Sequence, residues 1–252
     1  MLLGLCLGGS TVLAGLGGIC TAPTAFAADT ADKTYDDTNW HGTWDITSAD
    51  TLTLKNSSTG FSMVNSEASF GTVNVIGGQF YADQGSVGTL NVENAEGYTS
   101  GVTLEGTAKI GNLNLANSAA AVNLADTAQI TGTAVISAGT LNAGYVKHDW
   151  NAGTTSDQSY SGTINVLDLE GSSSLTLYKS DLLTNTLIYN TTGTVTNDDN
   201  RTVTTNALTL GSSMTADQLS NMKKLNLMAQ NSTGLAITNN SSLDDAAAAA
   251  LI

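Results

Sequence analysis

Hydrophobic and polar residues alternate in a short phrase that recurs along the middle of the chain. In its first copy, Val73 and Val75 point to one side of an extended strand, while Thr72 and Asn74 point to the other. The copies are Gly71–Val75, Gly88–Val92 and Gly111–Leu115, two weaker ones at Gly132–Ile136 and Gly139–Ala143, and a last one at Gly162–Val166. The first four begin 17, 23 and 21 residues apart. Strands that recur with a period of about 20 residues are typical of a solenoid.

A solenoid also explains why each copy is apolar on one side only. A strand of about five residues cannot bury that side alone, but stacked coils share one interior, and each strand pairs with its equivalents in the neighbouring coils. A second phrase keeps the same period, since Thr107–Ile110 and Thr127–Ile130 lie 20 residues apart. We therefore expect internal apolar columns and an outer ladder of amide side chains. The expected columns contain Val73, Val75, Leu90, Val92, Leu113 and Leu115, and the expected ladder contains Asn74, Asn91, Asn114 and Asn165.

An antiparallel sandwich is the alternative fold, because its strands also alternate and recur every 8–12 residues or so. Two features favour the parallel coil. Asn-Gly and Asp-Gly, the dipeptides that most strongly indicate hairpins, do not occur in the chain. The repeated phrase also keeps its direction of alternation from one copy to the next. The sequence therefore predicts an all-β fold, a parallel β-helix over residues 51–212.

The first 27 residues have the character of a secretory signal peptide. They carry no charged side chain, they are apolar and rich in glycine, and Ala25–Ala27 fits the small–x–small rule for cleavage. A transmembrane anchor is the competing interpretation, and Pro23 and the Ala-x-Ala ending favour removal. We expect cleavage between Ala27 and Ala28. N-terminal sequencing of exported protein checks this, and a mature chain that begins near Met1 would contradict it.

Residues 28–50 are expected to form an N-terminal cap on the open end of the coil. Two tryptophans lie close together here, Trp40 and Trp44. Their proximity also suits stacking on a carbohydrate, although covering the coil end is the simpler interpretation. Further along, the period loosens after Val146, so residues 147–162 are expected to form a protruding loop. Its expected anchors are Trp150 and Tyr160.

Residues 213–252 are expected to contain helix. Thr215 and Gln218 have the spacing of a capping box. An apolar stripe follows, formed by Leu219, Met222 and Leu225. A second helix start at Ser242 leads into an alanine run without a stop signal, so we expect the natural protein to continue beyond Ile252.

Composition narrows the function classes. The formal net charge is −14, with 22 acidic and 8 basic residues, which excludes the positive surface that nucleic-acid binding requires. Both cysteines, Cys6 and Cys20, lie in the expected signal peptide. The mature chain would then have no disulfides, so ladders of backbone hydrogen bonds are expected to hold it together.

A search for chemistry predicts no catalytic, cofactor or metal site. The two histidines, His41 and His148, have no partner motif for a catalytic triad and no metal-ligand spacing. Carboxylate pairs for glycoside cleavage need only proximity in space. On a parallel coil, Glu93, Glu105 and Asp126 are acids that such stacking could bring together.

The signal peptide, the cysteine-free body rich in Ser, Thr, Asn and Gly, and the Gly-Thr-Leu-Asn-Val phrases together resemble the passenger region of bacterial autotransporters (type V secretion), especially adhesin-like ones. The resemblance covers roughly residues 29–210. It implies a right-handed parallel β-helix displayed at the outer-membrane surface of a Gram-negative bacterium or released outside the cell. It also implies a downstream translocator β-barrel, which this sequence lacks. The implied role is adhesion or a structural stalk, without enzymatic activity, and the implied partner is a glycan or protein of a host or neighbouring cell. A secreted β-helical enzyme that degrades polysaccharides is the alternative.

Overall fold

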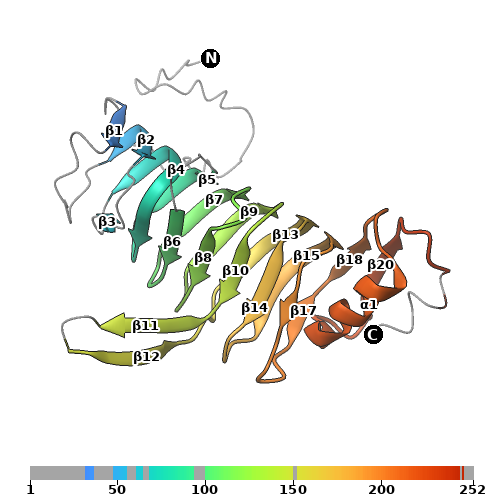
Figure 1. Ribbon diagram of the computed structural model, residues 1–252. Coiled ribbons are helices and arrows are strands. Elements are labelled where there is room, and N and C mark those ends of the chain that lie inside the picture. Colours follow the sequence, from blue (N-terminus) through green and yellow to red (C-terminus); the bar gives the residue numbers. More distant parts are fainter. Residues whose placement is uncertain are drawn as a thin grey trace, which may run out of the picture.

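The computed structural model describes residues 32–36, 48–55, 61–64, 68–93, 100–149, 152–244 and 246. In these residues the chain forms a parallel β-solenoid of about 8 turns with one short helix near its C-terminal end. The coils stack along one axis, and a two-stranded hairpin projects from the stack (Figure 1). The expected fold class is therefore confirmed.

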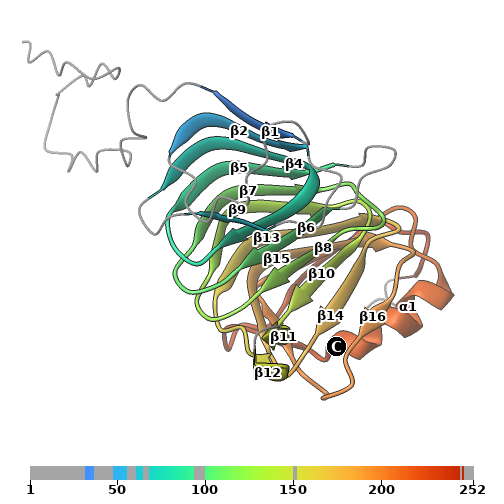
Figure 2. The ribbon, with the colours of Figure 1, turned by 60° about the vertical axis from the view of Figure 1, so that its left-hand side comes forward.

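Two parallel sheets, named A and B here, run along the solenoid, and the central coils contribute strands to both (Figure 2). Sheet A contains β1 (Lys33–Asp36), β2 (Ala49–Lys55), the first part of β4 (Ser69–Ala82), β5 (Ser86–Val92), β7 (Lys109–Leu115), β9 (Gln129–Ile136), β13 (Thr163–Gly171), β15 (Leu182–Thr191), β17 (Val203–Thr205), β18 (Ala207–Leu210), β19 (Leu227–Ala229) and β20 (Ala236–Asn239). Sheet B contains β3 (Phe61–Val64), the last part of β4, β6 (Ser100–Leu104), β8 (Ala121–Leu124), β10 (Thr140–Ala143), β14 (Ser174–Leu177) and β16 (Val195–Thr196). Sheet A thus begins with β1, which precedes residue 51, and ends with β19 and β20, which follow residue 212.

The interior is built from columns of apolar side chains, one per coil. In sheet A, Leu90 lies in register between Val73 and Leu113, and all three are fully buried. The neighbouring column, two residues further along each strand, holds Val75, Val92 and Leu115 in the same way. All six residues expected in the columns are therefore confirmed in place. Sheet B supplies its own column, which contains Phe80, Val102, Val122, Leu141 and Leu175.

An amide ladder follows the outer face of sheet A. The Asn91 Nδ2 donates to Asn74 Oδ1 at 2.8 Å, and the Asn114 Nδ2 donates to Asn91 Oδ1 at 2.8 Å. These three rungs are confirmed. Asn165 does not join them; its Oδ1 instead accepts from Asn185 Nδ2 at 2.8 Å, in a separate pair.

The last copies of the repeated phrase were placed wrongly by the sequence pattern. Ile164 lies in register with Ile130, which itself pairs with Ile110, so the phrase in β13 is displaced along the strand. Val166 is only partly buried, and Leu167 takes the core position beside Ala134. The phrase at Gly139–Ala143 is also displaced, because it forms β10 in sheet B. In both cases the residue types match the repeated phrase, but the segment occupies a different position in the coil.

Glycines stack on one another along sheet A. A side chain built on Gly111 would place its Cβ 2.3 Å from the Gly88 carbonyl oxygen, and one on Gly88 would lie 2.6 Å from the Gly71 carbonyl oxygen. Gly132 repeats this contact against Gly111 at 2.4 Å. The first glycine of the phrase is therefore required by the close approach of successive coils.

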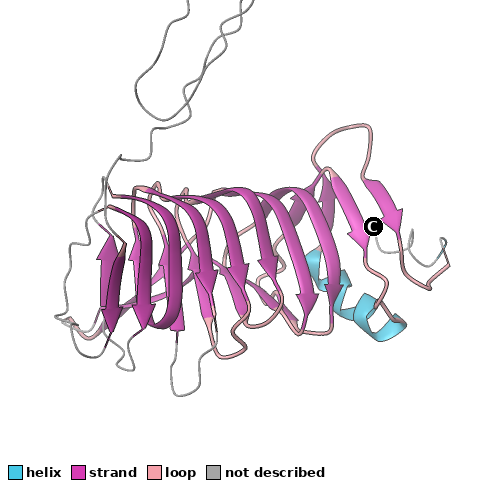
Figure 3. Ribbon diagram, turned by 90° about the horizontal axis from the view of Figure 1, so that it is seen from above, coloured by secondary structure: helices cyan, strands magenta, loops and turns pink. Residues whose placement is uncertain are grey.

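The helix α1 (Ala216–Met222), with a short 3-10 turn over Lys223–Leu225, lies at the end of the solenoid (Figure 3). The expected cap is present, since the Thr215 N–H donates to Gln218 Oε1 at 2.6 Å. The stripe Leu219, Met222 and Leu225 is buried in the core, as expected. Asn221 bonds to the last strand of sheet B, because its Oδ1 accepts from the Val195 N–H at 3.1 Å. The helix thus covers an edge that would otherwise expose an unpaired donor.

Several expectations fall outside the described residues. They concern the signal peptide and its cleavage at Ala27 and Ala28, and most of the cap, including Trp40 and Trp44. The anchor Trp150, His41 and the alanine run after Ser242 apart from residue 246 also lie there. Within the expected cap, β1 is described, and it pairs in parallel with β2 as the first strand of sheet A.

Replacing Asp168 by Asn is expected to raise the melting temperature at pH 7. The Asp168 Oδ1 is buried without a hydrogen-bond partner among the described residues, and burial, followed by the charge of Glu170, raises the pKa of its carboxyl above the ordinary 3.8. A raised pKa in the folded state means that the charged form opposes folding, so this penalty exists above the folded pKa and vanishes below 3.8. Thermal melts of Asp168→Asn and the parent protein should therefore differ at pH 7 and converge near about pH 3. An equal difference at both pH values would contradict the charge argument.

Candidate functional site

One corner of the solenoid departs from the regular coil. In each turn, this corner leads the chain from sheet B back to sheet A. In most coils it is short, but after β10 it carries the hairpin of β11 (Tyr145–Asp149) and β12 (Thr154–Gln158), which are antiparallel. The chain enters the hairpin through Gly144, whose φ of 79° favours glycine. The expected protruding loop over residues 147–162 is therefore present, as an ordered hairpin that begins two residues earlier.

Strand β11 is fixed to the preceding coils by one carboxylate. Glu105, which directly follows β6, accepts from the Tyr145 hydroxyl at Oε2 and from the Lys147 Nζ at Oε1, both at 2.8 Å. Glu105 is only 7% exposed. Burial, followed by the hydrogen bond and charge of Glu105, raises the pKa of the Tyr145 hydroxyl well above its ordinary value.

Strand β12 is fixed to the following coil by a second carboxylate. Asp157 accepts from the Tyr178 hydroxyl at 2.6 Å and from the Lys179 Nζ at 2.5 Å. These hydrogen bonds, with that of Lys179 the stronger, lower the pKa of the Asp157 carboxyl. At the base of the hairpin, Tyr160 is buried and its backbone N–H donates to Ser180 Oγ at 2.8 Å. Tyr160 thus packs where it was expected to anchor the segment, and the hairpin is tied to coils on both sides.

A cleft of about 260 Å³, named the hairpin groove here, separates β11 from the outer face of sheet B. Lys147 lies over one wall, with its Nζ 5.4 Å from the centre of the Tyr81 ring. The remaining lining is rich in hydrogen-bonding groups. The groove is lined by Gln79, Tyr81, Thr103, Asn123, Tyr145, Val146, Lys147 and His148. Aromatic faces beside amides and hydroxyls suit a polar ligand with an apolar side, such as a sugar ring.

Acidic residues gather next to this groove. Asp83, Glu105 and Asp126 line a neighbouring cleft of about 270 Å³. The structure therefore brings together two of the three acids that stacking was expected to assemble. Glu93 lies elsewhere, at the end of β5, where its backbone oxygen accepts from Asn117 Nδ2 at 2.9 Å.

Glu105 and Asp126 both accept hydrogen bonds from other parts of the chain. Both carboxylate oxygens of Glu105 accept bonds from β11. The Asp126 Oδ2 accepts from the Gly106 N–H at 3.1 Å, and Asp126 itself has a left-handed φ of 52°. These bonds hold the corner together.

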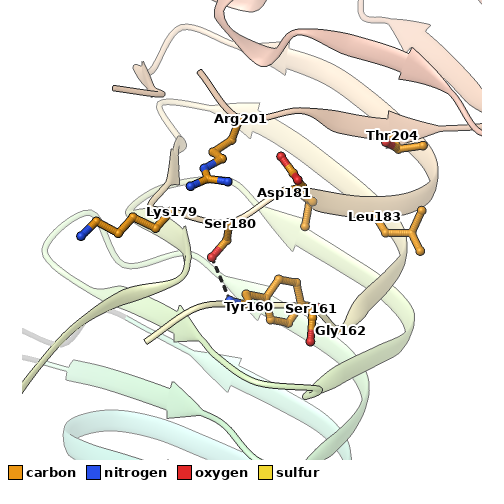
Figure 4. Close-up of a pocket in the computed structure, with 10 residues that line it drawn as sticks. Tyr160, Ser161, Gly162, Lys179, Ser180, Asp181, Leu183, Arg201 and Thr204 are labelled. Atoms are coloured by element: carbon orange, nitrogen blue, oxygen red, sulfur yellow. Dashed lines mark hydrogen bonds between the residues drawn. The ribbon is translucent and has the colours of Figure 1, made fainter. Parts of the chain in front are cut away.

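A second cleft lies on the same corner, on the far side of the hairpin base, and is named the Arg201 pocket here. It measures about 320 Å³ and lies between the end of β12 and the turns that precede β15 and β17. Its polar lining includes Ser161, Lys179, Asp181 and Arg201 (Figure 4).

His148 is the other residue from the search for chemistry that the structure describes. His148 lies on β11 in the hairpin groove, next to Asp149 along the chain. In the part of the chain that the structure describes, no three His, Cys, Asp or Glu side chains come close enough together to hold a metal ion. Among the same residues, none of the helices is long and apolar enough to cross a membrane.

Sequence reasoning missed the residues that shape both clefts, notably Tyr81, Tyr145 and Arg201. The loss of the 20-residue period after Val146 was the signal for the inserted hairpin, because an insertion in a solenoid maps to one face. Nothing in the sequence indicated which coils the inserted hairpin contacts.

Comparisons of the chain with models of known protein families, with curated proteins and with solved structures found no match.

Proposed function

We propose that this protein is a non-enzymatic surface adhesin that binds a glycan in the hairpin groove. The observation that supports this most directly is the double attachment of the hairpin, through Glu105 on one side and Asp157 on the other. A free hairpin would lose conformational entropy on binding, whereas one fixed in advance presents its groove ready for a ligand. The regular coils then serve as the rigid body that carries the groove.

The setting that we propose is that of an autotransporter passenger. This proposal rests on the pattern of the sequence: an exportable leader, a cysteine-free body and repeated strand phrases. The solenoid fold is compatible with it. The protein would be exported to the outer-membrane surface of a Gram-negative bacterium or beyond, and its partner would belong to a host or neighbouring cell. The translocator β-barrel would lie downstream in the full-length protein.

The alternative, an enzyme that degrades polysaccharides, is favoured by one observation: acids, a lysine and tyrosines do gather on one corner. The hydrogen bonds weigh against it. A general acid or nucleophile needs an oxygen directed at the substrate, and both oxygens of Glu105 are held by Tyr145 and Lys147. Turnover of a bacterial or host polysaccharide that is lost in Asp126→Asn, in folded protein, would overturn the proposal of a non-enzymatic protein.

Binding to immobilised neutral and charged oligosaccharides tests the adhesin. Tyr81→Ala removes an aromatic face of the groove, so we expect affinity to fall about tenfold, the equivalent of ~1.4 kcal/mol. Deleting residues 145–158 removes the hairpin and should abolish binding, because one wall of the groove is lost. Asn91→Ser, on the outer face of sheet A, is the matched control and should bind like the parent.

Circular dichroism and thermal melts must show that the variants keep the coil. Parent protein that binds no oligosaccharide, or unchanged affinity in both groove variants with the fold intact, would contradict the proposal.

A further inference from the structure

Arg201 is the only arginine in the chain, and its backbone is held on both sides. Its N–H donates to Asn197 Oδ1 at 2.6 Å, and its carbonyl oxygen accepts from Asn197 Nδ2 at 2.7 Å and from Asn226 Nδ2 at 3.0 Å. The residue therefore sits in a fixed turn just before β17. From there its side chain points toward Ser180 and Lys179 (Figure 4).

Among the described residues, the Nε of the guanidinium is buried and has no hydrogen-bond partner. A guanidinium stays charged at every physiological pH. Burying part of it without a hydrogen bond costs free energy, which makes such a group uncommon. An acceptor oxygen of a ligand would remove this cost if the side chain turned its Nε toward the pocket.

The neighbouring charges define what kind of ligand fits. Lys179 is engaged by Asp157 of the hairpin, so Arg201 is the cation in this pocket that has no described partner. Asp181 also lines the pocket, and its Oδ1 accepts from the Thr202 N–H at 2.8 Å. A dianion would be repelled by Asp181, whereas a singly charged oxyanion can face Arg201 while its uncharged part lies toward the aspartate.

We propose that the Arg201 pocket binds the carboxylate or sulfate ester of an acidic sugar, held by the planar fork of the guanidinium. Such pairs form two parallel hydrogen bonds and are about twice as strong as neutral ones. That the anion is carried by a glycan rests on the proposed function, because this pocket and the hairpin groove lie on the same corner, on opposite sides of the hairpin base. The oxyanion chemistry itself rests on Arg201.

A single arginine makes the test direct, since its Nε–Hε group gives one signal in a ¹⁵N spectrum of the labelled protein. We would titrate the protein with a uronic acid trisaccharide, a sulfated neutral trisaccharide and the unmodified neutral trisaccharide, all at constant ionic strength. The Arg201 signal is expected to move in a saturable manner with one or both charged sugars and to stay in place with the neutral one. The two charged arms distinguish a carboxylate from a sulfate ligand.

Substitutions complete the experiment. Arg201→Gln should weaken binding of the charged trisaccharide by about tenfold or more, and Arg201→Lys should restore only part of it, because an ammonium cannot form the fork. Lys109→Gln, which removes the same charge from an exposed position on β7, should have little effect. Binding by Arg201→Gln equal to that of the parent, or an Arg201 signal that moves only with added sodium chloride, would overturn the inference.

The two proposals can fail separately. If Tyr81→Ala weakens glycan binding while Arg201→Gln does not, the adhesin proposal stands and the anion site is wrong. If the Arg201 signal responds to the charged trisaccharide while the hairpin deletion has no effect on binding, the anion site stands and the hairpin groove is not the binding surface.

Discussion

Leu90→Asp is expected to unfold the coils around β5. Leu90 is fully buried between Val73 and Leu113 in one of the apolar columns. Removing a buried leucine costs about 2–5 kcal/mol, and burying an unpaired carboxylate in its place costs several more. A domain is commonly stable by only about 5–15 kcal/mol, so the substitution should consume most of that margin.

The matched control is Asn91→Ser, one residue along the same strand. Asn91 faces outward and joins two bonds of the amide ladder, so its loss should cost about 1–2 kcal/mol. Thermal melts of the two variants measure the contrast, at roughly 2–4 °C per kcal/mol for a chain of this size. Equal losses would mean that β5 is not buried on one side only.

Gly111→Ala is expected to cost about 1–3 kcal/mol or more, although it adds only a methyl group. The new Cβ would lie 2.3 Å from the Gly88 carbonyl oxygen, on backbone that pairs β5 with β7. Relief requires the two coils to separate, because a backbone carbonyl in a ladder cannot rotate away. The φ of Gly111 lies outside the left-handed region, so the whole effect is steric.

Gly153→Ala gives the opposite control. This glycine has a φ of 63°, and an added Cβ would have nothing within 4 Å. Its cost is therefore conformational alone, about 1 kcal/mol. Chemical denaturation compares the two, and a larger loss for Gly153→Ala would contradict the close stacking of the glycines.

The parallel β-solenoid could be predicted from the sequence because two periods coincide. A period of 2 selects the buried side of each strand, and a period of about 20 stacks the strands into coils. Where both hold, as at Leu90 and Leu113, the positions were predicted correctly. They diverge near Ile164, which lies in register with Ile130 and, through it, with Ile110 instead of Leu113. Neither period contains information on such a displacement along the strand, so Val166 was expected in the interior, where Leu167 lies instead.

The clefts were beyond prediction for a related reason. Glu105 and Lys147 are separated by 42 residues, which comprise two coils and the first three residues of the hairpin. Their contact depends on the exact length of each coil and on the direction in which the hairpin folds. The Arg201 pocket depends likewise on a turn fixed by Asn197 and Asn226.

The ladder between coils also has a kinetic consequence. The Asn91–Asn74 and Asn114–Asn91 pairs join residues only 17 and 23 positions apart, so closing each loop costs little entropy in a chain of 252 residues. Contacts this local give the solenoid a low contact order despite its β content, unlike a sandwich of the same size. Folding can nucleate in one coil and propagate to the next, and a pulling force would remove the coils in sequence from an end.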